Sequence, residues 1–287
     1  MGGGDRMEAV RRLYDIIKEA DAVAIGGGSG LSTAAGYDYS GERFRENFAE
    51  FIDRYGMTDM YSAGFYPFPT KEEKWAYWSR HIYCNRYDQK PSRLYMDIRR
   101  LVEEKEYFVI TTNVDHQFYE AGFEEDRIFA VQGDYGQFQC AKACHSKLYD
   151  NERQVREMIR QQHGLRIPAA LIPRCPVCGG DMEVHLRCDG YFIEDEAWHA
   201  ACGRYEQFIR RYSGKRILFL ELGVGMNTPG IIKYPFWQMT AKYEHAFYIC
   251  VNKGQAWAPL EIRERALCMD ADLAEVLGQL MEERTVE

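Results

Sequence analysis

The stretch DAVAIGGGSG, residues 21–30, decides the fold, because a short apolar run ends there in four glycines. The run at 21–25 is typical of a buried strand, and apolar residues recur at helical spacing over 6–20. Glycines after a strand let backbone N–H groups approach a diphosphate. The spacing does not fit the G-x-G-x-x-G dinucleotide fingerprint, and no acidic residue ends a second strand about twenty residues on. The loop is therefore either a diphosphate-binding loop or a flexible glycine turn.

Further apolar runs follow downstream, and they are mostly unbroken, as in strands that are buried on both faces. They lie at 107–111, 127–131, 216–222 and 246–251. Together with the helical stretches between them, they predict an α/β protein: a Rossmann-like parallel sheet with helices on both faces.

Two segments interrupt this pattern. Residues 37–91 are mainly helical, and their aromatic residues at helical spacing are typical of a core rather than of a cofactor contact. Residues 136–213 hold clustered cysteines, prolines and glycines. We expect a Rossmann domain of 1–36, 92–135 and 214–287, and a small domain formed by a helical insert (37–91) and a zinc-binding insert (136–213).

Composition excludes two classes of partner. The 287 residues are 46 % apolar and carry a net charge of −8, so no basic field exists to bind a nucleic acid or an anionic membrane. No apolar run approaches the roughly 20 residues that span a bilayer. Nine cysteines without an export signal indicate thiols or metal ligands rather than disulfides. We expect a cytosolic protein.

Four of the cysteines form two close pairs, Cys140-x₃-Cys144 and Cys175-x₂-Cys178. Paired thiolates on tight turns can close a tetrahedral zinc site, and four ligands leave no position open for catalysis. The pattern predicts structural zinc. Two alternatives stay open: one ligand is replaced by His145, Cys188 or Cys202, or the thiols are reduced and bind no metal.

A second motif, TTNVDH at 111–116, closes the strand at 107–111, at the edge where α/β sheets bind ligands. Asn113 and Asp115, two residues apart, can face one pocket. Together with Gly28-Ser29-Gly30-Leu31-Ser32 and Gly36, this motif resembles the sirtuin family, whose signatures are GAGxS…G and TQNxD. The resemblance covers most of the chain. It implies a sirtuin-type Rossmann domain that binds NAD, and a structural Cys₄ zinc.

The resemblance also implies individual roles. Gly28, Ser29, Gly30 and Ser32 correspond to the loop that holds the NAD diphosphate. Asn113 corresponds to the residue that orients the nicotinamide ribose, and Asp115 to the one that hydrogen-bonds the nicotinamide amide. The adenosine side corresponds to Gly223, Gly225, Asn227 and Asn252. Tyr39 stands for the phenylalanine that shields C1′, and Arg43 or Arg45 substitutes for a phosphate-binding arginine.

The sequence departs from deacylating sirtuins at Gln132, where those enzymes have a histidine that acts as general base. Glutamine can orient a hydroxyl but cannot take its proton. Scission of the nicotinamide–ribose bond does not require that base, so Asn113, Asp115 and Gln132 are the predicted catalytic residues. The nucleophile is then a protein side chain or water, which makes the protein an ADP-ribosyltransferase or an NAD glycohydrolase. A weak deacylase and an NAD or ADP-ribose sensor are two further hypotheses.

A sirtuin with glutamine at this place resembles the macrodomain-linked class, which modifies a lipoylated carrier similar to the glycine-cleavage H protein. The implied acceptor is therefore such a carrier. Two neighbouring residues have open roles: His116 supports the loop or acts as a base, and Asp134 is an acid or base or a turn residue. A basic stretch is a solvated helix face or a docking site for an acidic carrier; it comprises Arg153, Arg156, Arg160 and Arg166.

Overall fold

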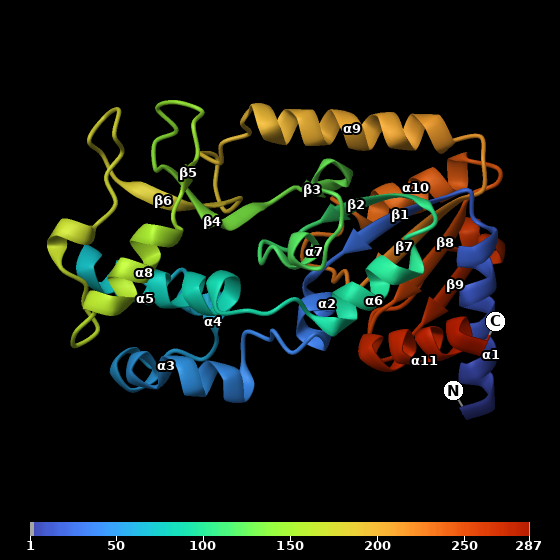
Figure 1. Ribbon diagram of the computed structural model, residues 1–287, viewed down its shortest axis with the longest axis horizontal. Coiled ribbons are helices and arrows are strands. Elements are labelled where there is room, and N and C mark those ends of the chain that lie inside the picture. Colours follow the sequence, from blue (N-terminus) through green and yellow to red (C-terminus); the bar gives the residue numbers. More distant parts are fainter. Residues whose placement is uncertain (1–2, 287) are drawn as a thin grey trace.

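The computed structural model describes residues 3–286 and shows two domains, a large one built on a parallel sheet and a smaller one beside it (Figure 1). The large sheet has six strands in the order β3-β2-β1-β7-β8-β9, and all neighbouring pairs are parallel. Its strands are β1 (Ala22–Gly27), β2 (Glu106–Thr111), β3 (Ile128–Ala130), β7 (Ile217–Leu222), β8 (Phe247–Val251) and β9 (Ala266–Met269).

Helices cover both faces of this sheet, because alternate residues of each strand point to opposite sides. In β1, Val23 and Ile25 pack into one core cluster, and Ala22 and Ala24 into another. The first cluster lies under α1 (Gly3–Glu19), α6 (Arg93–Leu101) and α11 (Leu273–Val286). The second lies under α9 (Glu196–Tyr212) and α10 (Lys233–Lys242). The predicted α/β fold with a parallel, doubly covered sheet is confirmed.

The strand order reverses at β1, which lies between β2 and β7. Ligands of open α/β sheets bind where the order reverses, beyond the carboxyl ends of the strands. The loops after β1, β2 and β7 therefore define the expected binding edge. Short helices follow two of these strands and another precedes β9; they are α2 (Ser29–Ala34), α7 (Gln117–Glu120) and the 3₁₀ helix η4 (Leu260–Arg265).

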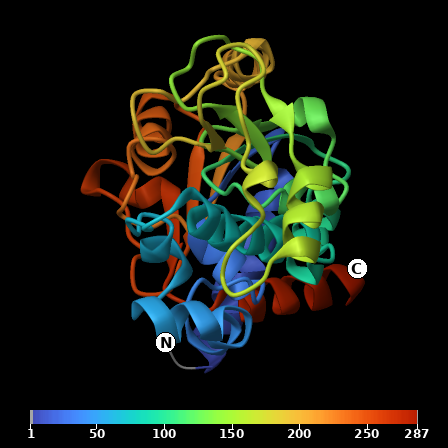
Figure 2. The ribbon, with the colours of Figure 1, turned by 90° about the vertical axis from the view of Figure 1, so that its left-hand side faces the viewer.

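The small domain combines helices from the first insert with a three-stranded antiparallel sheet and a helix from the second. The helices are α3 (Gly41–Tyr55), α4 (Met60–Ala63), α5 (Lys71–Ile82), the π-helix η1 (Tyr83–Tyr87) and α8 (Glu152–Gln161). The sheet has the order β5-β4-β6 and consists of β4 (Gly133–Cys140), β5 (Tyr149–Asp150) and β6 (Met182–Leu186). Figure 2 looks onto this domain and shows α5 beside α8.

One aromatic core holds the small domain together. Phe48 of α3 lies 5.3 Å from the ring of Tyr77 in α5, and Trp75 of α5 lies 5.0 Å from Phe138 in β4. The aromatic stripe of the first insert is thus core, as its spacing predicted. Residues of both inserts contribute to this core.

Helix α9 lies inside the stretch 136–213 that we expected to form the zinc-binding insert, yet it covers the large sheet. Its Phe208 and Tyr205 pack on Phe108 of β2, with ring centroids 5.7 Å apart in each pair. The face of β2 and β3 would otherwise be exposed, and the apolar stripe of α9 buries it. The insert thus returns to the large domain before residue 196.

Candidate active site

The loops after β1 and β7 are in direct backbone contact. The N–H of Gly30 donates to the carbonyl oxygen of Gly223 at 2.9 Å. A Cβ on Gly28 would lie 2.6 Å from that same oxygen. Gly223 has φ +64°, and a Cβ there would lie 2.2 Å from the backbone nitrogen of Leu31. Only glycine fits at these positions, so the glycines of the predicted loop are required for the two loops to meet.

Asn113 lies where the loop after β2 meets the loop after β1. Its amide nitrogen is 2.9 Å from the carbonyl oxygen of Gly28, 3.1 Å from Ser32 Oγ and 3.2 Å from the hydroxyl of Tyr95. Its backbone N–H donates to Thr111 Oγ1 at 3.0 Å. These contacts fix the side chain, so its amide oxygen has one defined direction.

Asp115 is the buried acid of the site, with 6 % of its surface exposed. Ser32 Oγ donates to Asp115 Oδ2 at 2.5 Å, and the backbone N–H of Gln117 donates to Oδ1 at 3.2 Å. Burial raises the pKa of Asp115 above its usual value, although both hydrogen bonds oppose that shift. The structure thus joins Ser32, Asn113 and Asp115, which come from two sequence motifs, in one network.

Tyr95 of α6 completes this network and was missed by sequence reasoning. Its hydroxyl is 2.8 Å from Ser32 Oγ, and burial raises its pKa well above the usual value. Nothing in the sequence distinguishes Tyr95 from the other apolar residues of its helix. Its role follows only from the packing of α6 against the sheet.

Gln132 lies between β3 and β4, half-buried, and its carbonyl oxygen accepts from the N–H of Arg187 at 3.0 Å. Within residues 3–286, its side chain makes no hydrogen bond. Asp134 lies two residues further along the chain. Its Oδ2 is hydrogen-bonded to Nδ1 of His116 at 2.5 Å, and its Oδ1 accepts from Nε of Arg86 at 3.1 Å. Arg86, in the first insert, was also missed by sequence reasoning.

The two candidate phosphate-binding arginines, Arg43 and Arg45, differ in their burial and their contacts. Arg43 is half-buried, stacks over Tyr37 at 5.7 Å, and donates to the carbonyl oxygens of Asp38 and Cys84. It pairs with no carboxylate in the described part of the chain. Arg45 is exposed. Arg43 is therefore a half-buried cation without a carboxylate partner among the described residues.

Tyr39, the expected shield of C1′, packs toward the small domain. Its hydroxyl is 2.7 Å from that of Tyr135, and its ring meets the edge of His81 at 5.7 Å. Burial raises its pKa, and the charge of Asp115 contributes to the shift. Tyr39 thus lies near Asp115 and links the site to the aromatic core.

On the β7–β8 side of the point where the strand order reverses, Asn252 is buried and donates to the carbonyl oxygen of Val224 at 3.0 Å. This bond holds the start of the loop that carries Gly225 and Asn227. Asn227 is exposed, and Met226 is held by Gln255 Oε1 at 2.9 Å. The four expected adenosine-side residues therefore lie around one loop, with Asn227 on its outer surface.

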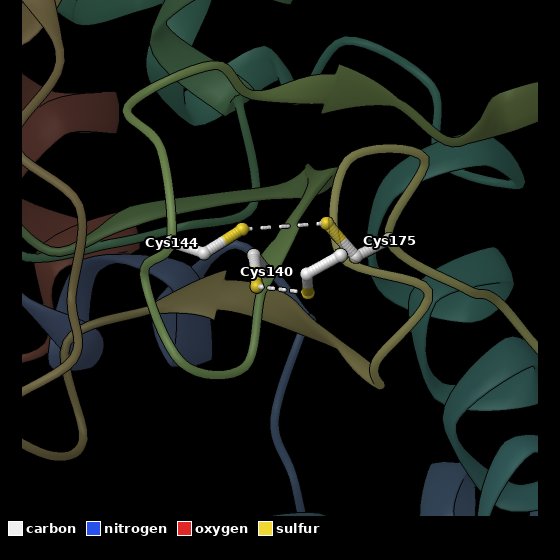
Figure 3. Close-up of side chains that lie close together, drawn as sticks. Cys140, Cys144 and Cys175 are labelled. Carbon is white, nitrogen blue, oxygen red and sulfur yellow. Dashed lines mark hydrogen bonds between the residues drawn. The ribbon is translucent and has the colours of Figure 1, made fainter.

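The four paired cysteines converge in the small domain (Figure 3). Their sulfur atoms all lie within 4.8 Å of one another; Cys140 and Cys178 are 3.8 Å apart, and Cys144 and Cys175 3.7 Å. A tetrahedron with Zn–S bonds of about 2.3 Å has edges of roughly 3.8 Å, so the set fits zinc. Cys188 and Cys202 lie outside this cluster.

His145 is the remaining candidate ligand. Its Nδ1 is 3.1 Å from Cys144 Sγ, and its Nε2 is 2.8 Å from the hydroxyl of Tyr149. It does not belong to the group of four converging sulfur atoms. The cysteine set that the spacing predicted is therefore the one that could hold structural zinc.

The basic stretch, which runs along α8 and ends at Arg166 beyond it, is mostly paired. Arg156 pairs with Glu152, Arg160 with Glu157 at 2.5 Å, and Arg166 reaches Glu73 of α5 at 3.0 Å. These pairs neutralise most of the positive charge, which favours the solvated helix face over a docking site.

Comparison with known proteins identifies the class. No family model matches the chain. Solved structures of similar fold include Sir2Tm bound to a propionylated peptide (TM-score 0.63, 19 % identity, 97 % of this chain and 99 % of that one). Another is Sir2 with a p53 peptide and NAD⁺ (TM-score 0.58, 20 % identity, 97 % and 99 %). The fold is that of the sirtuins.

Two curated relatives with similar sequences indicate the protein family more closely than the fold does. The chain is 39 % identical over 266 residues, 92 % of its length and 84 % of the relative's, to a protein ADP-ribosyltransferase of Staphylococcus aureus strain Mu50. It is 30 % identical to a probable bifunctional ADP-ribose hydrolase/ADP-ribosyltransferase of Fusarium oxysporum f. sp. cubense, of which it spans 46 %. The chain belongs to the protein ADP-ribosyltransferases, and its fold is that of the sirtuins. No helix among the described residues is long and apolar enough to cross a membrane.

Proposed function

We propose that the protein cleaves the nicotinamide–ribose bond of NAD and transfers the ADP-ribose to a protein side chain. The Staphylococcus relative supports this reaction. One structural observation supports it at this site: the side-chain amide of Asn113 is hydrogen-bonded to Gly28, Ser32 and Tyr95, where the strand order of the sheet reverses. Such a network places polar groups beside a buried acid, Asp115, before any substrate arrives.

In this proposal the loop of Gly28, Ser29, Gly30 and Ser32 holds the NAD diphosphate, and Arg43 supplies the cation beside it. Arg43 suits that role because it is half-buried and pairs with no carboxylate of the described chain. Gly223, Gly225, Asn227 and Asn252 bind the adenosine side. Tyr39 closes the pocket toward the small domain.

Asn113, Asp115 and Gln132 carry the cleavage. The departing nicotinamide leaves an oxocarbenium-like ribose, which fixed polar groups stabilise at no reorganisation cost. Asn113 orients the ribose hydroxyls, and Asp115 hydrogen-bonds the carboxamide of nicotinamide. Gln132 orients a hydroxyl but takes no proton, which disfavours the deacylation that a histidine supports.

We propose a lipoylated carrier protein similar to the glycine-cleavage H protein as the acceptor, on the ground of the class that has glutamine at this place. The products distinguish this activity from its rivals: a transferase releases nicotinamide mainly with its acceptor, a glycohydrolase does so without protein, and a sensor does not. We also propose a cytosolic location, since none of the nine cysteines forms a disulfide in residues 3–286.

The test is an assay with ³²P-labelled NAD and the carrier in lipoylated and unlipoylated form. We expect label on the lipoylated carrier only, with stoichiometric release of nicotinamide. Equal labelling of both forms would reject lipoylation as the determinant. Nicotinamide release without labelled protein would make the enzyme a glycohydrolase.

A further inference from the structure

His116 and Asp134 form a hydrogen-bonded pair beside the proposed catalytic residues. Nδ1 of the imidazole is 2.5 Å from Asp134 Oδ2. His116 comes directly after Asp115 and Asp134 two residues after Gln132, so each is on a segment that carries the proposed chemistry. With Asn113 and Asp115, both line one small cavity between β2 and β4. The two residues are 18 positions apart in the sequence, and the fold brings them together.

Asp134 is held as the charged partner of this pair. Its Oδ1 accepts from Arg86 Nε at 3.1 Å and from the backbone N–H of Gly136 at 2.6 Å. Burial opposes ionisation, but the hydrogen bond from His116 and the charge of Arg86 prevail, and the pKa of Asp134 is lowered. With the carboxylate of Asp134 as acceptor, Nδ1 is the N–H donor of this hydrogen bond, and the tautomer that serves as a base has its lone pair on Nε2.

The imidazole of His116 is also fixed in orientation. Its ring stacks on Tyr119, with centroids 4.2 Å apart and planes inclined by 16°. Its backbone is left-handed (φ 68°), which is unusual for a residue other than glycine. In the described part of the chain Nε2 makes no hydrogen bond, and it is not among the buried unpartnered atoms. Nε2 is thus an oriented acceptor open to solvent.

We propose that His116 is the general base of the transfer and that Asp134 is its positioning residue. This rests on the proposed function and supplies the base that Gln132 cannot be. The proton of the acceptor X–H group moves to Nε2, the X–C1′ bond forms as the C1′–N bond breaks, and nicotinamide leaves neutral. An aspartate that holds the imidazole with its free nitrogen toward the nucleophile is the arrangement used by catalytic triads.

The left-handed backbone at residue 116 allows a glycine substitution, and this substitution is the basis of the experiment. His116→Gly suits a left-handed backbone, so the variant should fold, and it leaves a space against Tyr119 for free imidazole. His116→Gln keeps an amide donor for Asp134 but has no base. The reaction is followed as nicotinamide release from NAD, both with the lipoylated carrier and with water as the only nucleophile.

We expect both variants to lose about 10²–10⁴-fold in kcat, as for loss of a general base, with little change in KM for NAD. Added imidazole restores part of the rate to His116→Gly and none to His116→Gln. The pH profile of kcat in the parent has an acid limb, as for any reaction that needs an unprotonated base, and the glycine variant without imidazole lacks it. Other charged or titratable groups face the pair; they are Arg86, Asp115, Tyr119, Glu120 and His185.

Two results would overturn the inference: a rate for His116→Gly within about threefold of the parent, or full activity of His116→Gln, which would make the pair a structural link only. Failure of the proposed function is distinct, because the parent enzyme itself would then release no nicotinamide from NAD.

Discussion

The side-chain amide of Asn113 lies 2.9 Å from the carbonyl oxygen of Gly28, and this contact joins the loops that follow two neighbouring strands of the sheet. One side chain thereby holds a backbone loop in place and lines the same small cavity as Asp115. Removing it should affect chemistry far more than folding, since Asn113 is only half-buried and contributes no apolar core.

For Asn113→Ala we expect nicotinamide release to fall by about 10²–10³-fold, the usual effect of removing one fixed polar group that stabilises a transition state. The melting temperature should change little. A nicotinamide-release assay and a thermal melt separate the two effects. Near-normal turnover of a folded variant would contradict the central role of Asn113.

Gln132→Ala should lower the rate by about tenfold, the equivalent of about 1.4 kcal/mol for one lost orienting hydrogen bond. Gln137→Ala is the matched control, because Gln137 is also half-buried and lies five residues further along the chain. We expect the control to retain the parent rate. A similar loss in both variants would indicate a general disturbance of the chain in and before β4 rather than a contact with ribose.

Gly223→Ala should destabilise the fold and weaken NAD binding together. The new Cβ would lie 2.2 Å from the nitrogen of Leu31 on a backbone with φ +64°, so the two loops must separate. We expect a loss of about 1–3 kcal/mol in the free energy of unfolding, measured by urea denaturation. Gly230→Ala, whose Cβ would meet nothing within 4 Å, should be close to neutral.

The two acids of the site should respond to pH with opposite sign. Burial raises the pKa of Asp115, so its ionisation costs stability above the usual aspartate range, and Asp115→Asn should be more stable than the parent at pH 7. The pKa of Asp134 is lowered, so that residue contributes stability at pH 7, and Asp134→Asn should be less stable there. The Asp115 difference should shrink as the pH falls toward about 4, the usual pKa of an unfolded aspartate. The Asp134 difference should persist there and shrink only at lower pH, as the pH falls through the lowered pKa of Asp134. Melting curves at both pH values give the answer; the same sign for both variants would refute these assignments.

Cys175→Ser should abolish stoichiometric zinc and destabilise the small domain, because one of four converging ligands is lost. Cys202→Ser is the control, since that thiol lies outside the cluster. Atomic absorption on untagged protein measures the metal. Equal zinc in both variants, or none in the parent, would argue against a metal site.

The parts of this structure that were predictable are those in which the pattern is local. Unbroken apolar runs indicated β1, β2, β3, β7 and β8 because these strands are buried on both faces. Strand β9 was missed: it is four residues long, lies at the edge of the sheet, and only Met269 is fully buried. Helix α9 was placed in the insert because nothing in its own sequence indicates which domain it covers.

The residues of the candidate site also fall into two groups, those that local sequence patterns indicate and those that only tertiary packing brings to the site. Glycine loops and the Asn113 motif were visible because each lies directly after a strand. Tyr95 and Arg86 were not, because each reaches the site from a helix through tertiary packing. The pairing of His116 with Asp134 also depends on how two strand ends are placed side by side.

The shared aromatic core has a consequence for synthesis. The helices of residues 41–87 leave the ribosome before β4 and β6 exist to cover Trp75, which is 2 % exposed in the finished fold. Until the chain has grown past residue 186, this segment exposes an aromatic surface that favours aggregation. Loss of the later insert should therefore yield aggregated protein, and chaperone dependence should be greatest during that interval of translation.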